Sequence, residues 1–231
     1  ACRREKTAYT PVWFMRQAGR YMAEYRDLRS RFAFLDLCQR PDLAAEITVT
    51  AVERLGVDAA IIFSDILLLL EPMGVGLEYS EGDGPLIRRP VRGAADVDRL
   101  PEIDPEKSLP FVFEAVRKSC DALNGKVPLI GFSGAPFTLA SYLIEGGGSR
   151  NYVRTKSLMY SDAGAWRALM ERLVRAVSGL LNAQIAAGAE VVQLFDSWVG
   201  CMGPADYERY VLPYTRAVIC ALAPGVPVIH F

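Results

Sequence analysis

Two arginines and an aspartate are the residues of this sequence with the clearest chemical potential. Arg16 and Arg20 stand four residues apart in the stretch PVWFMRQAGR, and Asp65 follows the apolar run Ala59–Phe63. Each guanidinium offers a planar fork that matches a carboxylate or a phosphate, so the two can hold one anion between them. Asp65 supplies a negative charge that can stabilise a cation. The plainer alternatives are a surface arginine pair with ordinary ion pairs and an aspartate that caps a helix or a turn.

The positive charge of the chain is concentrated at its start. The 231 residues carry a formal net charge of −1 and are 51% apolar, as in a single domain with a large core. Residues 1–31 have a local balance of +5, from Arg3, Arg4, Lys6, Arg16, Arg20, Arg26, Arg29 and Arg31 against Glu5, Glu24 and Asp27. A local basic patch on a nearly neutral chain indicates a small anionic ligand rather than a nucleic acid, which needs a broad basic face. The alternative for Arg3, Arg4 and Lys6 is a solvated, mobile arm.

Composition argues against several other classes of protein. The five cysteines are scattered and odd in number, which favours reduced thiols in the cytosol. His230 is the only histidine, so a Ser-His-Asp triad or a histidine-rich metal site is nearly excluded within these residues. The charged start is unlike a signal peptide. The longest apolar stretch, Ala59–Leu70, is too short to span a bilayer and is interrupted by Ser64 and Asp65.

Strands and helices must alternate to position these residues. We expect Gly19 to turn the chain through left-handed angles between the two arginines, and Asp162 to cap a long amphipathic helix that Gly188 closes. Residues 24–31 read as a charged helix or loop and 72–105 as an irregular excursion. The expected strands are 12–15, 59–63, 127–132, 190–195 and 226–231, and the expected helices are 41–55, 108–123, 163–187 and 213–222.

This alternation predicts an α/β fold, either a doubly wound sheet or a (β/α)8 TIM-type barrel. The barrel is favoured because four successive strands end in polar residues, at Arg16-Gln17, Ser64-Asp65, Ser133 and Asp196-Ser197. Barrel enzymes assemble their active sites from such strand ends. Five strands are too few for closure, so we expect residues 1–231 to be one barrel domain with about the first five βα units, lacking the C-terminal strands. Such a fragment is expected to be unstable or inactive alone; the alternative is that residues are missing only from the record.

The sequence resembles uroporphyrinogen decarboxylases in five stretches that run in family order through essentially the whole chain. They are PVWFMRQAGRYMAEYRDLR, FLDLCQRPDLAAEIT, DAAIIFSDIL, LIGFSGAPFTLASYLIEGGGSR and VVQLFDSWVG. The resemblance implies a (β/α)8 barrel and a cytosolic carboxy-lyase of heme biosynthesis that is a homodimer at full length. The reaction it implies removes CO2 from the four acetate side chains of uroporphyrinogen III to give coproporphyrinogen III, without cofactor or metal. Neither nucleic acid nor a membrane is an expected partner.

The resemblance also implies a set of site residues. Asp65 and Arg16 are the implied catalytic residues, and Asp65 faces the pyrrole N–H groups. The implied substrate contacts are Arg16, Gln17, Ala18 (through its backbone), Gly19, Arg20, Arg29, Asp65, Tyr142 and Ser197. The substrate carries eight carboxylates, so arginines at the mouth of the site fit it. Protonation of a pyrrole carbon makes a cationic ring that can take the electrons left by departing CO2, and Asp65 would stabilise that cation.

Structural roles remain open for several of these positions. Tyr142 can pack in the core, Ser197 can satisfy a turn, and Asp196 can be a partner for a helix N-terminus. His230 reads as a core or strand-end histidine and is not the equivalent of the histidine that the family places in its last barrel segment.

Two other functions compete with the decarboxylase. The first is a corrinoid-type methyltransferase on the same scaffold, which would use zinc held by histidine and cysteine. The second is a tetrapyrrole-binding protein without turnover. RQAGR and FSDIL argue against the first, and Asp65 with its arginines argues against the second.

Overall fold

The protein is described by a computed structural model that covers residues 1–80 and 84–231. Its centre is a parallel sheet of β1 (Ala60–Ile61), β4 (Leu129–Gly134), β5 (Val191–Phe195) and β6 (Val228–His230). Within these residues the strands lie in the order β1-β4-β5-β6, so each parallel strand joins the sheet beside the preceding one. A barrel is assembled in this order, whereas a doubly wound sheet reverses at a switch point. The predicted α/β class is confirmed, and the sheet is an arc of a barrel.

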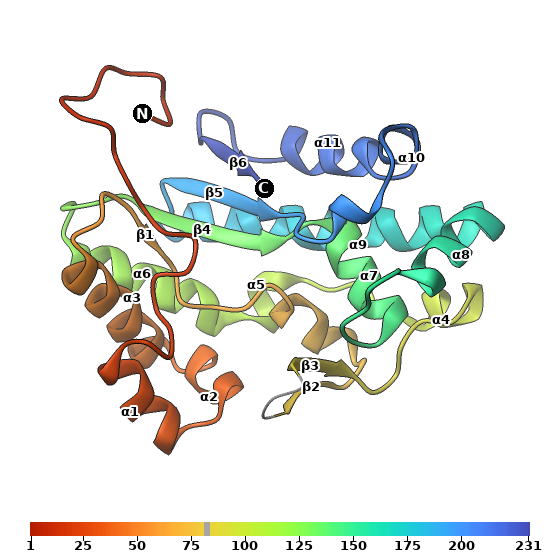
Figure 1. Ribbon diagram of the computed structural model, residues 1–231, viewed down its shortest axis with the longest axis horizontal. Helices are drawn as coiled ribbons and strands as arrows, with labels where there is room; N and C mark the ends of the chain where they lie inside the picture. Colours follow the sequence, from red (N-terminus) through yellow and green to blue (C-terminus); the bar gives the residue numbers. More distant parts are fainter. Residues whose placement is uncertain (81–83) are drawn as a thin grey trace.

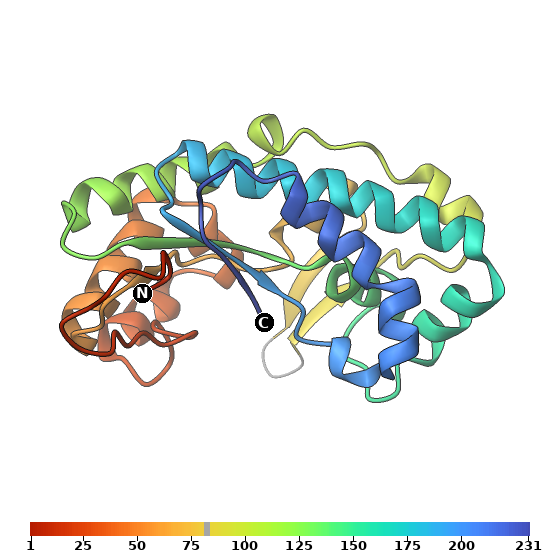
Figure 2. The same cartoon turned by 90° about the horizontal axis from the view of Figure 1, so that it is seen from above.

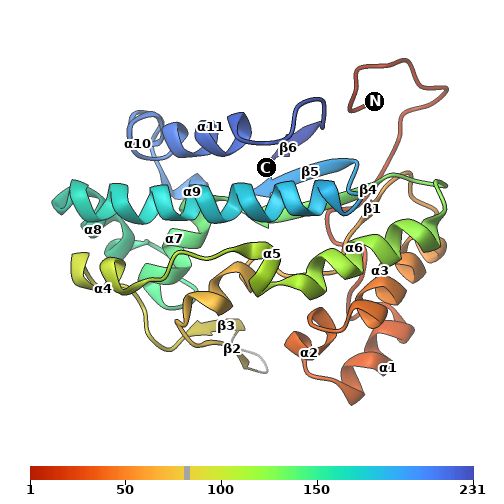
Figure 3. The same ribbon diagram turned by 180° about the vertical axis from the view of Figure 1, so that it is seen from behind.

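Helices cover one side of the sheet (Figure 1, Figure 2). The longest, α9, crosses the back of the molecule with α6 and α3 on one side of it and α11 on the other (Figure 3). The helices are α1 (Ala23–Arg31), α2 (Phe34–Cys38), α3 (Pro41–Leu55), α4 (Ala94–Arg99), α5 (Pro105–Ser108), α6 (Pro110–Leu123), α7 (Pro136–Glu145), α8 (Val153–Ser161), α9 (Ala163–Ala186), α10 (Pro204–Tyr210) and α11 (Leu212–Cys220), with 3-10 turns over Leu68–Met73 and Val199–Cys201. In the described residues, no helix combines the length and the apolarity that crossing a membrane requires.

The expected helix boundaries have clear physical causes. Pro41 occupies the first turn of α3, and Gly56 ends it in the left-handed conformation with φ 61°. Asp162 caps α9, because its Oδ1 accepts a hydrogen bond from the N–H of Ala165 at 2.9 Å. These predictions are confirmed to within two residues.

β1 leaves the sheet early, and this departure shapes the site. Its ladder with β4 ends where the N–H of Ile62 donates to the carbonyl of Ile130 at 3.0 Å. The next residue, Phe63, donates its N–H to Oγ1 of Thr48 on α3 at 2.9 Å, so the chain turns towards that helix. Gln184 of α9 takes over the pairing with β4, since its amide bonds both the N–H and the carbonyl of Phe132, at 2.7 and 2.9 Å. The backbone of β4 therefore stays paired while residues 63–67 diverge from it.

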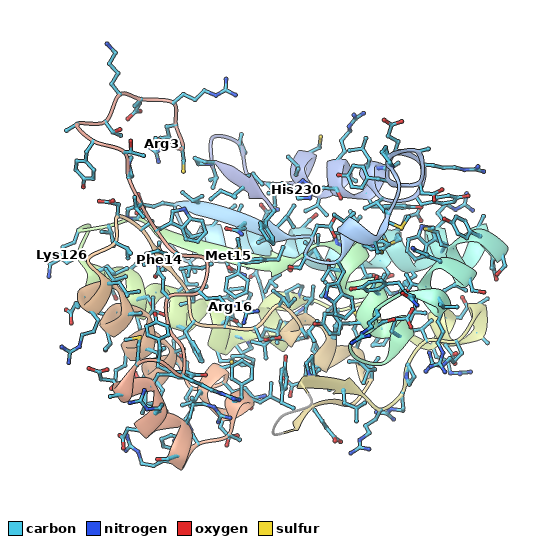
Figure 4. All side chains as sticks on the ribbon, viewed as in Figure 1. Arg3, Phe14, Met15, Arg16, Lys126 and His230 are labelled. Carbon is cyan, nitrogen blue, oxygen red and sulfur yellow. The ribbon has the colours of Figure 1, made fainter. Side chains whose placement is uncertain are left out.

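The prediction of a buried strand over residues 12–15 is wrong. The segment is extended but forms no ladder, and the side chains of Val12 and Phe14 are 52% and 50% exposed (Figure 4). It follows the outer edge of β1, where the N–H of Val12 donates to Asp58 at 2.7 Å and its carbonyl accepts from the N–H of Asp58 at 2.8 Å. Beyond this point a side chain, that of Gln17, replaces backbone pairing. The apolar composition predicted burial, but no described strand lies on the other side of the segment.

The stretch 72–105 is more ordered than predicted. It contains an antiparallel hairpin of β2 (Leu77–Ser80) and β3 (Gly84–Ile87), followed by α4. Residues 81–83 of this stretch lie outside the described residues. Strands of four residues with Gly and Pro among them carry too little alternation to be recognised in the sequence.

Candidate active site

A cavity of about 740 Å³ lies at the carboxyl ends of β1, β4 and β5. The segment 15–21 and the residues 61–67 that diverge from the sheet line much of it, and Phe132, Phe195 and Ser197 complete the side nearest the sheet. The predicted site residues that line it are Arg16, Gln17, Ala18, Gly19, Arg20, Asp65, Tyr142 and Ser197. Residues far apart in the sequence are thus brought to one space, as expected from their positions after strands.

Asp65 is held in this cavity by one of its two carboxylate oxygens. Its Oδ1 accepts hydrogen bonds from the N–H of Leu67 at 2.8 Å and from the hydroxyl of Tyr79. Burial raises the pKa of the Asp65 carboxyl, while the two hydrogen bonds and the nearby Arg16 guanidinium oppose this shift. The bond to Leu67 is a local turn contact, so both the capping reading and the cavity reading of Asp65 describe part of its position.

Arg16 and Arg20 both line the cavity, and both side chains are exposed. In the described part of the chain, neither guanidinium takes part in a salt bridge or a side-chain hydrogen bond, in contrast to their neighbours. Arg31 pairs with Asp27 at 2.6 Å, and Arg26 donates to the backbone carbonyl of Arg20 at 2.9 Å. The ordinary surface pairing considered for the two arginines is therefore absent from residues 1–80 and 84–231, and the forks are available to an anion.

Gln17 fixes the arginine segment to the sheet. The side chain is 2% exposed, its Nε2 donates to the carbonyl of Ala59 at 2.6 Å, and its Oε1 accepts from the N–H of Ile61 at 3.2 Å. The amide thus stands in for a strand partner at the edge of β1. Because both ends of the amide are used, Gln17 borders the cavity chiefly as the residue that positions Arg16.

Gly19 is needed for a different reason from the one predicted. Its φ lies outside the left-handed region, so the expected left-handed turn is wrong. The ring of Tyr21 instead lies 3.2 Å from the position that a Cβ would occupy, closer than nearly all real Cβ contacts. Tyr21 folds back in this way to donate its hydroxyl to the carbonyl of Gln17. The glycine therefore permits a close approach rather than an unusual backbone angle.

Arg29 is the predicted contact that does not line the cavity. It lies on α1 behind the wall, where its guanidinium is 6.0 Å from the ring centroid of Phe34 and donates to the carbonyl of Phe32. Arg3, labelled in Figure 4, lies still farther away, on the loop that projects at the start of the chain. The basic start of the sequence therefore divides into cavity residues and others.

Tyr142 and Ser197 enter the cavity from the side of α7 and β5. The ring of Tyr142 stacks on Trp198 with centroids 3.7 Å apart, and burial together with the Asp65 charge raises the pKa of Tyr142 to about 12. Its hydroxyl is therefore protonated at neutral pH. Ser197 is exposed and borders the same space.

Aromatic residues that the sequence did not single out form much of the wall. Phe132 and Phe195 meet edge to face at 5.3 Å, and Phe63 meets Tyr25 at 5.7 Å. Tyr79 of the hairpin also lines the cavity and touches Asp65. Only the positions of Phe132 and Phe195 near strand ends marked them in advance. Apolar walls lower the local dielectric, which strengthens the electrostatic effect of the charged groups between them.

Asp196 and His230 form a separate pair outside the cavity lining. Asp196 is buried, accepts from Oγ1 of Thr138 in the first turn of α7 at 3.0 Å, and has its other oxygen 3.7 Å from Nε2 of His230. His230 ends β6 (Figure 4). Both residues thus have the structural positions considered for them. Within the described ranges, no group of three or more His, Cys, Asp or Glu side chains is arranged to hold a metal ion.

Taken together, the cavity can bind a molecule that has both acidic arms and N–H donors. The unpaired guanidinium groups match carboxylates, and the Asp65 carboxylate matches N–H groups or a developing cation. The aromatic walls match an apolar framework.

Comparison with known proteins gives one consistent family. The sequence model described as "Uroporphyrinogen decarboxylase (URO-D)" matches residues 1–231. Among curated relatives, the uroporphyrinogen decarboxylase of Carboxydothermus hydrogenoformans is 56% identical and that of Sorangium cellulosum is 57% identical. Each match covers 100% of this chain and 66% of the relative, so the chain spans about two thirds of the length of these proteins.

A solved structure supports the fold independently. A methyltransferase from Methanosarcina mazei superposes with a TM-score of 0.77 over 99% of this chain and 66% of its own, at 19% sequence identity. At that identity the likeness concerns the fold alone, and together with the family it identifies the sheet as part of a TIM-type barrel. The match over the whole chain and the identities above 50% show that this chain belongs to the uroporphyrinogen decarboxylase family.

Proposed function

We propose that this protein removes CO2 from the four acetate side chains of uroporphyrinogen III to give coproporphyrinogen III in heme biosynthesis. The observation that carries the proposal is the placement of Asp65 and Arg16 in one cavity, with the guanidinium close enough to oppose the upward pKa shift of the carboxyl. The relatives that cover the whole chain carry the name of this activity.

Binding would rest on charge and shape. Arg16 and Arg20 would hold acetate or propionate groups by bidentate hydrogen bonds, with Ala18 and Gly19 contributing backbone and close approach. Tyr142 and Ser197 would contact the same ligand from the opposite side of the cavity. Gln17 and Arg29 would act through the segments they hold, since both side chains already bond backbone groups.

The chemistry would use the pyrrole itself as the electron sink. Protonation of a ring carbon next to the acetate arm makes a cationic ring. The C–C bond to the carboxylate then breaks, and its electron pair neutralises the ring as CO2 leaves. Asp65 would stabilise the cation at the moment it forms, in a site with apolar walls. Arg16 would position the departing carboxylate. Arginine keeps its proton because of its high pKa, so Arg16 is assigned no proton transfer.

The test is an anaerobic incubation of the protein at its natural length with uroporphyrinogen III, with CO2 and coproporphyrinogen both measured. The proposal predicts four CO2 per coproporphyrinogen formed. Tight binding without CO2 release would instead indicate a tetrapyrrole carrier. Stoichiometric zinc together with methyl transfer would indicate the methyltransferase reading.

We further propose that the protein is a cytosolic homodimer at its natural length and that residues 1–231 belong to one barrel domain. The five cysteines are all free, which suits a reducing compartment. Sedimentation equilibrium of the protein at its natural length would measure the oligomeric state, and a monomer at micromolar concentration would refute this part.

A further inference from the structure

Tyr79 is a cavity residue with no assigned role. It lies on β2, opposite Pro85 of β3, and both residues line the cavity. Its hydroxyl donates a hydrogen bond to Oδ1 of Asp65 across 14 positions of sequence. The hairpin that carries it is therefore joined directly to the carboxylate on which the proposed chemistry depends.

The two oxygens of Asp65 have different surroundings. Oδ1 accepts two hydrogen bonds, from Leu67 and from Tyr79. Oδ2 accepts none from residues 1–80 or 84–231, and the residue borders the cavity. A carboxylate held through one oxygen by two donors in different directions cannot rotate freely. The arrangement leaves Oδ2 as the oxygen available to a ligand.

Tyr79 is itself held in place. Its ring packs on Phe34 of α2 with centroids 4.9 Å apart. The hairpin is anchored at its base, where the N–H of Ile87 donates to the carbonyl of Gly146 at 2.8 Å and that of Arg89 to the carbonyl of Val75 at 2.9 Å. Burial and the nearby Asp65 charge raise the pKa of Tyr79, so the phenol remains a donor across the neutral range.

We propose that Tyr79 is a positioning residue that keeps Asp65 ionised and leaves its Oδ2 facing the ring N–H groups of the ligand. The role in the reaction rests on the proposed function, whereas the effect of Tyr79 on the carboxylate does not.

The other charged and titratable groups near Asp65 come from three elements. Arg16 of the opening segment favours the carboxylate anion. Cys38 of α2 and Tyr142 of α7 sense the Asp65 charge, and their own pKa values are raised, so they stay neutral. Loss of the Tyr79 hydroxyl leaves the N–H of Leu67 and Arg16 as the groups that oppose burial. The pKa of Asp65 must then rise further.

Tyr79→Phe tests this inference, because it removes the hydroxyl and keeps the ring on Phe34. The readout is the titration of the Asp65 carboxyl carbon, followed by 13C NMR in protein labelled at aspartate and assigned by its absence in Asp65→Asn. A hydrogen bond to a charged group is worth about 1.5–3 kcal/mol, so we expect the midpoint to rise by about one pH unit or more. Tyr160→Phe is the matched control, since Tyr160 donates to Asp206 at 2.5 Å on the exposed surface. It should leave the midpoint unchanged.

Kinetics give the second readout. In Tyr79→Phe the acid limb of kcat/KM should move to higher pH by the same amount as the NMR midpoint. Above that limb we expect kcat to fall about tenfold with KM within twofold of the wild-type value, because the acidic arms are held by the arginines. Replacement of Tyr79 by 3-fluorotyrosine, a stronger donor of the same shape, should move the midpoint the opposite way.

The outcomes separate the two claims. A midpoint that neither substitution moves overturns the role of Tyr79. A midpoint that moves as expected, in a protein that releases no CO2, keeps the contact to Asp65 and overturns the decarboxylase proposal.

Discussion

Replacing Asp65 by asparagine separates the electrostatic role of this residue from its structural one. An asparagine has nearly the same shape, and its Oδ1 can still accept from the N–H of Leu67 and the hydroxyl of Tyr79. The substitution removes only the charge. The arginine segment, which is held by Gln17 rather than by Asp65, should remain in place.

The size of the expected effect follows from the position of the carboxylate. A unit charge about 4 Å from a ring cation is worth about 4 kcal/mol at an effective dielectric constant of 20. An amide dipole recovers part of this, so we expect a loss of about 3–4 kcal/mol in the transition state, or roughly 10²–10³ in kcat. Substrate affinity should change much less, because Arg16 and Arg20 bind the acidic arms.

The assay is single-turnover CO2 release under anaerobic conditions at saturating uroporphyrinogen, with affinity measured separately. Asp206→Asn is the matched control, since Asp206 also accepts a tyrosine hydroxyl but lies on the surface. A decrease of less than tenfold in the rate of Asp65→Asn would refute the cation-stabilising role. An equal loss in affinity would show that the charge acts in binding instead.

The same variant should not lose stability. The folded pKa of Asp65 is raised, so the folded state holds this proton more tightly than the unfolded state. Stability contributed by the protonated form is therefore lost as pH rises through the folded pKa, and at neutral pH the ionised carboxyl opposes folding. Asp65→Asn lacks this penalty, so its urea midpoint relative to wild type should improve as pH rises from acidic to neutral. A variant that is less stable at pH 7 than at acidic pH, relative to wild type, would contradict the sign.

Three further substitutions test other parts of the description. Gln17→Leu leaves the carbonyl of Ala59 and the N–H of Ile61 without the amide, so the free energy of unfolding in urea should fall by about 2–4 kcal/mol; a loss below about 0.5 kcal/mol would show that the amide contributes little. Arg16→Ala should lower kcat and raise KM, each about tenfold, and weaken the dependence of KM on salt; an unchanged salt dependence would place the guanidinium outside the anion site. Asp162→Ala removes the cap of α9 and should cost about 1 kcal/mol in thermal unfolding while kcat per folded molecule is unchanged; altered kcat would mean that α9 shapes the site.

The strand ends could be predicted because their cause is local. Runs such as Ala59–Phe63 are apolar where both faces are covered, and the change to polar residues marks the point where the chain leaves the sheet. Parallel strands place these points at one edge, so Asp65 and Ser197 were expected to meet. The proline, glycine and aspartate that bound α3 and α9 act through the backbone next to them, and the sequence contains all that is needed.

The wrong predictions depend on contacts that are remote in sequence. The row Val12–Met15 has the composition of a buried strand, and its exposure depends on what flanks it rather than on its own residues. Gly19 is explained by the ring of Tyr21, which closes on it from outside the turn. Tyr79 gave no sign of a role, since its partner Asp65 lies across the cavity on another element.

The handover from β1 to Gln184 has a consequence for how such cavities diversify. Since Phe132 keeps both of its backbone partners without β1, the segment that carries Asp65 is mechanically uncoupled from the sheet beyond Ile62. Insertions or substitutions over residues 63–67 can widen or narrow the pocket, at no expense to the scaffold, as long as one glutamine on the opposite layer is retained. Variation in the ligand space of this barrel is therefore expected to accumulate on that short tether, while the strands behind it stay constant.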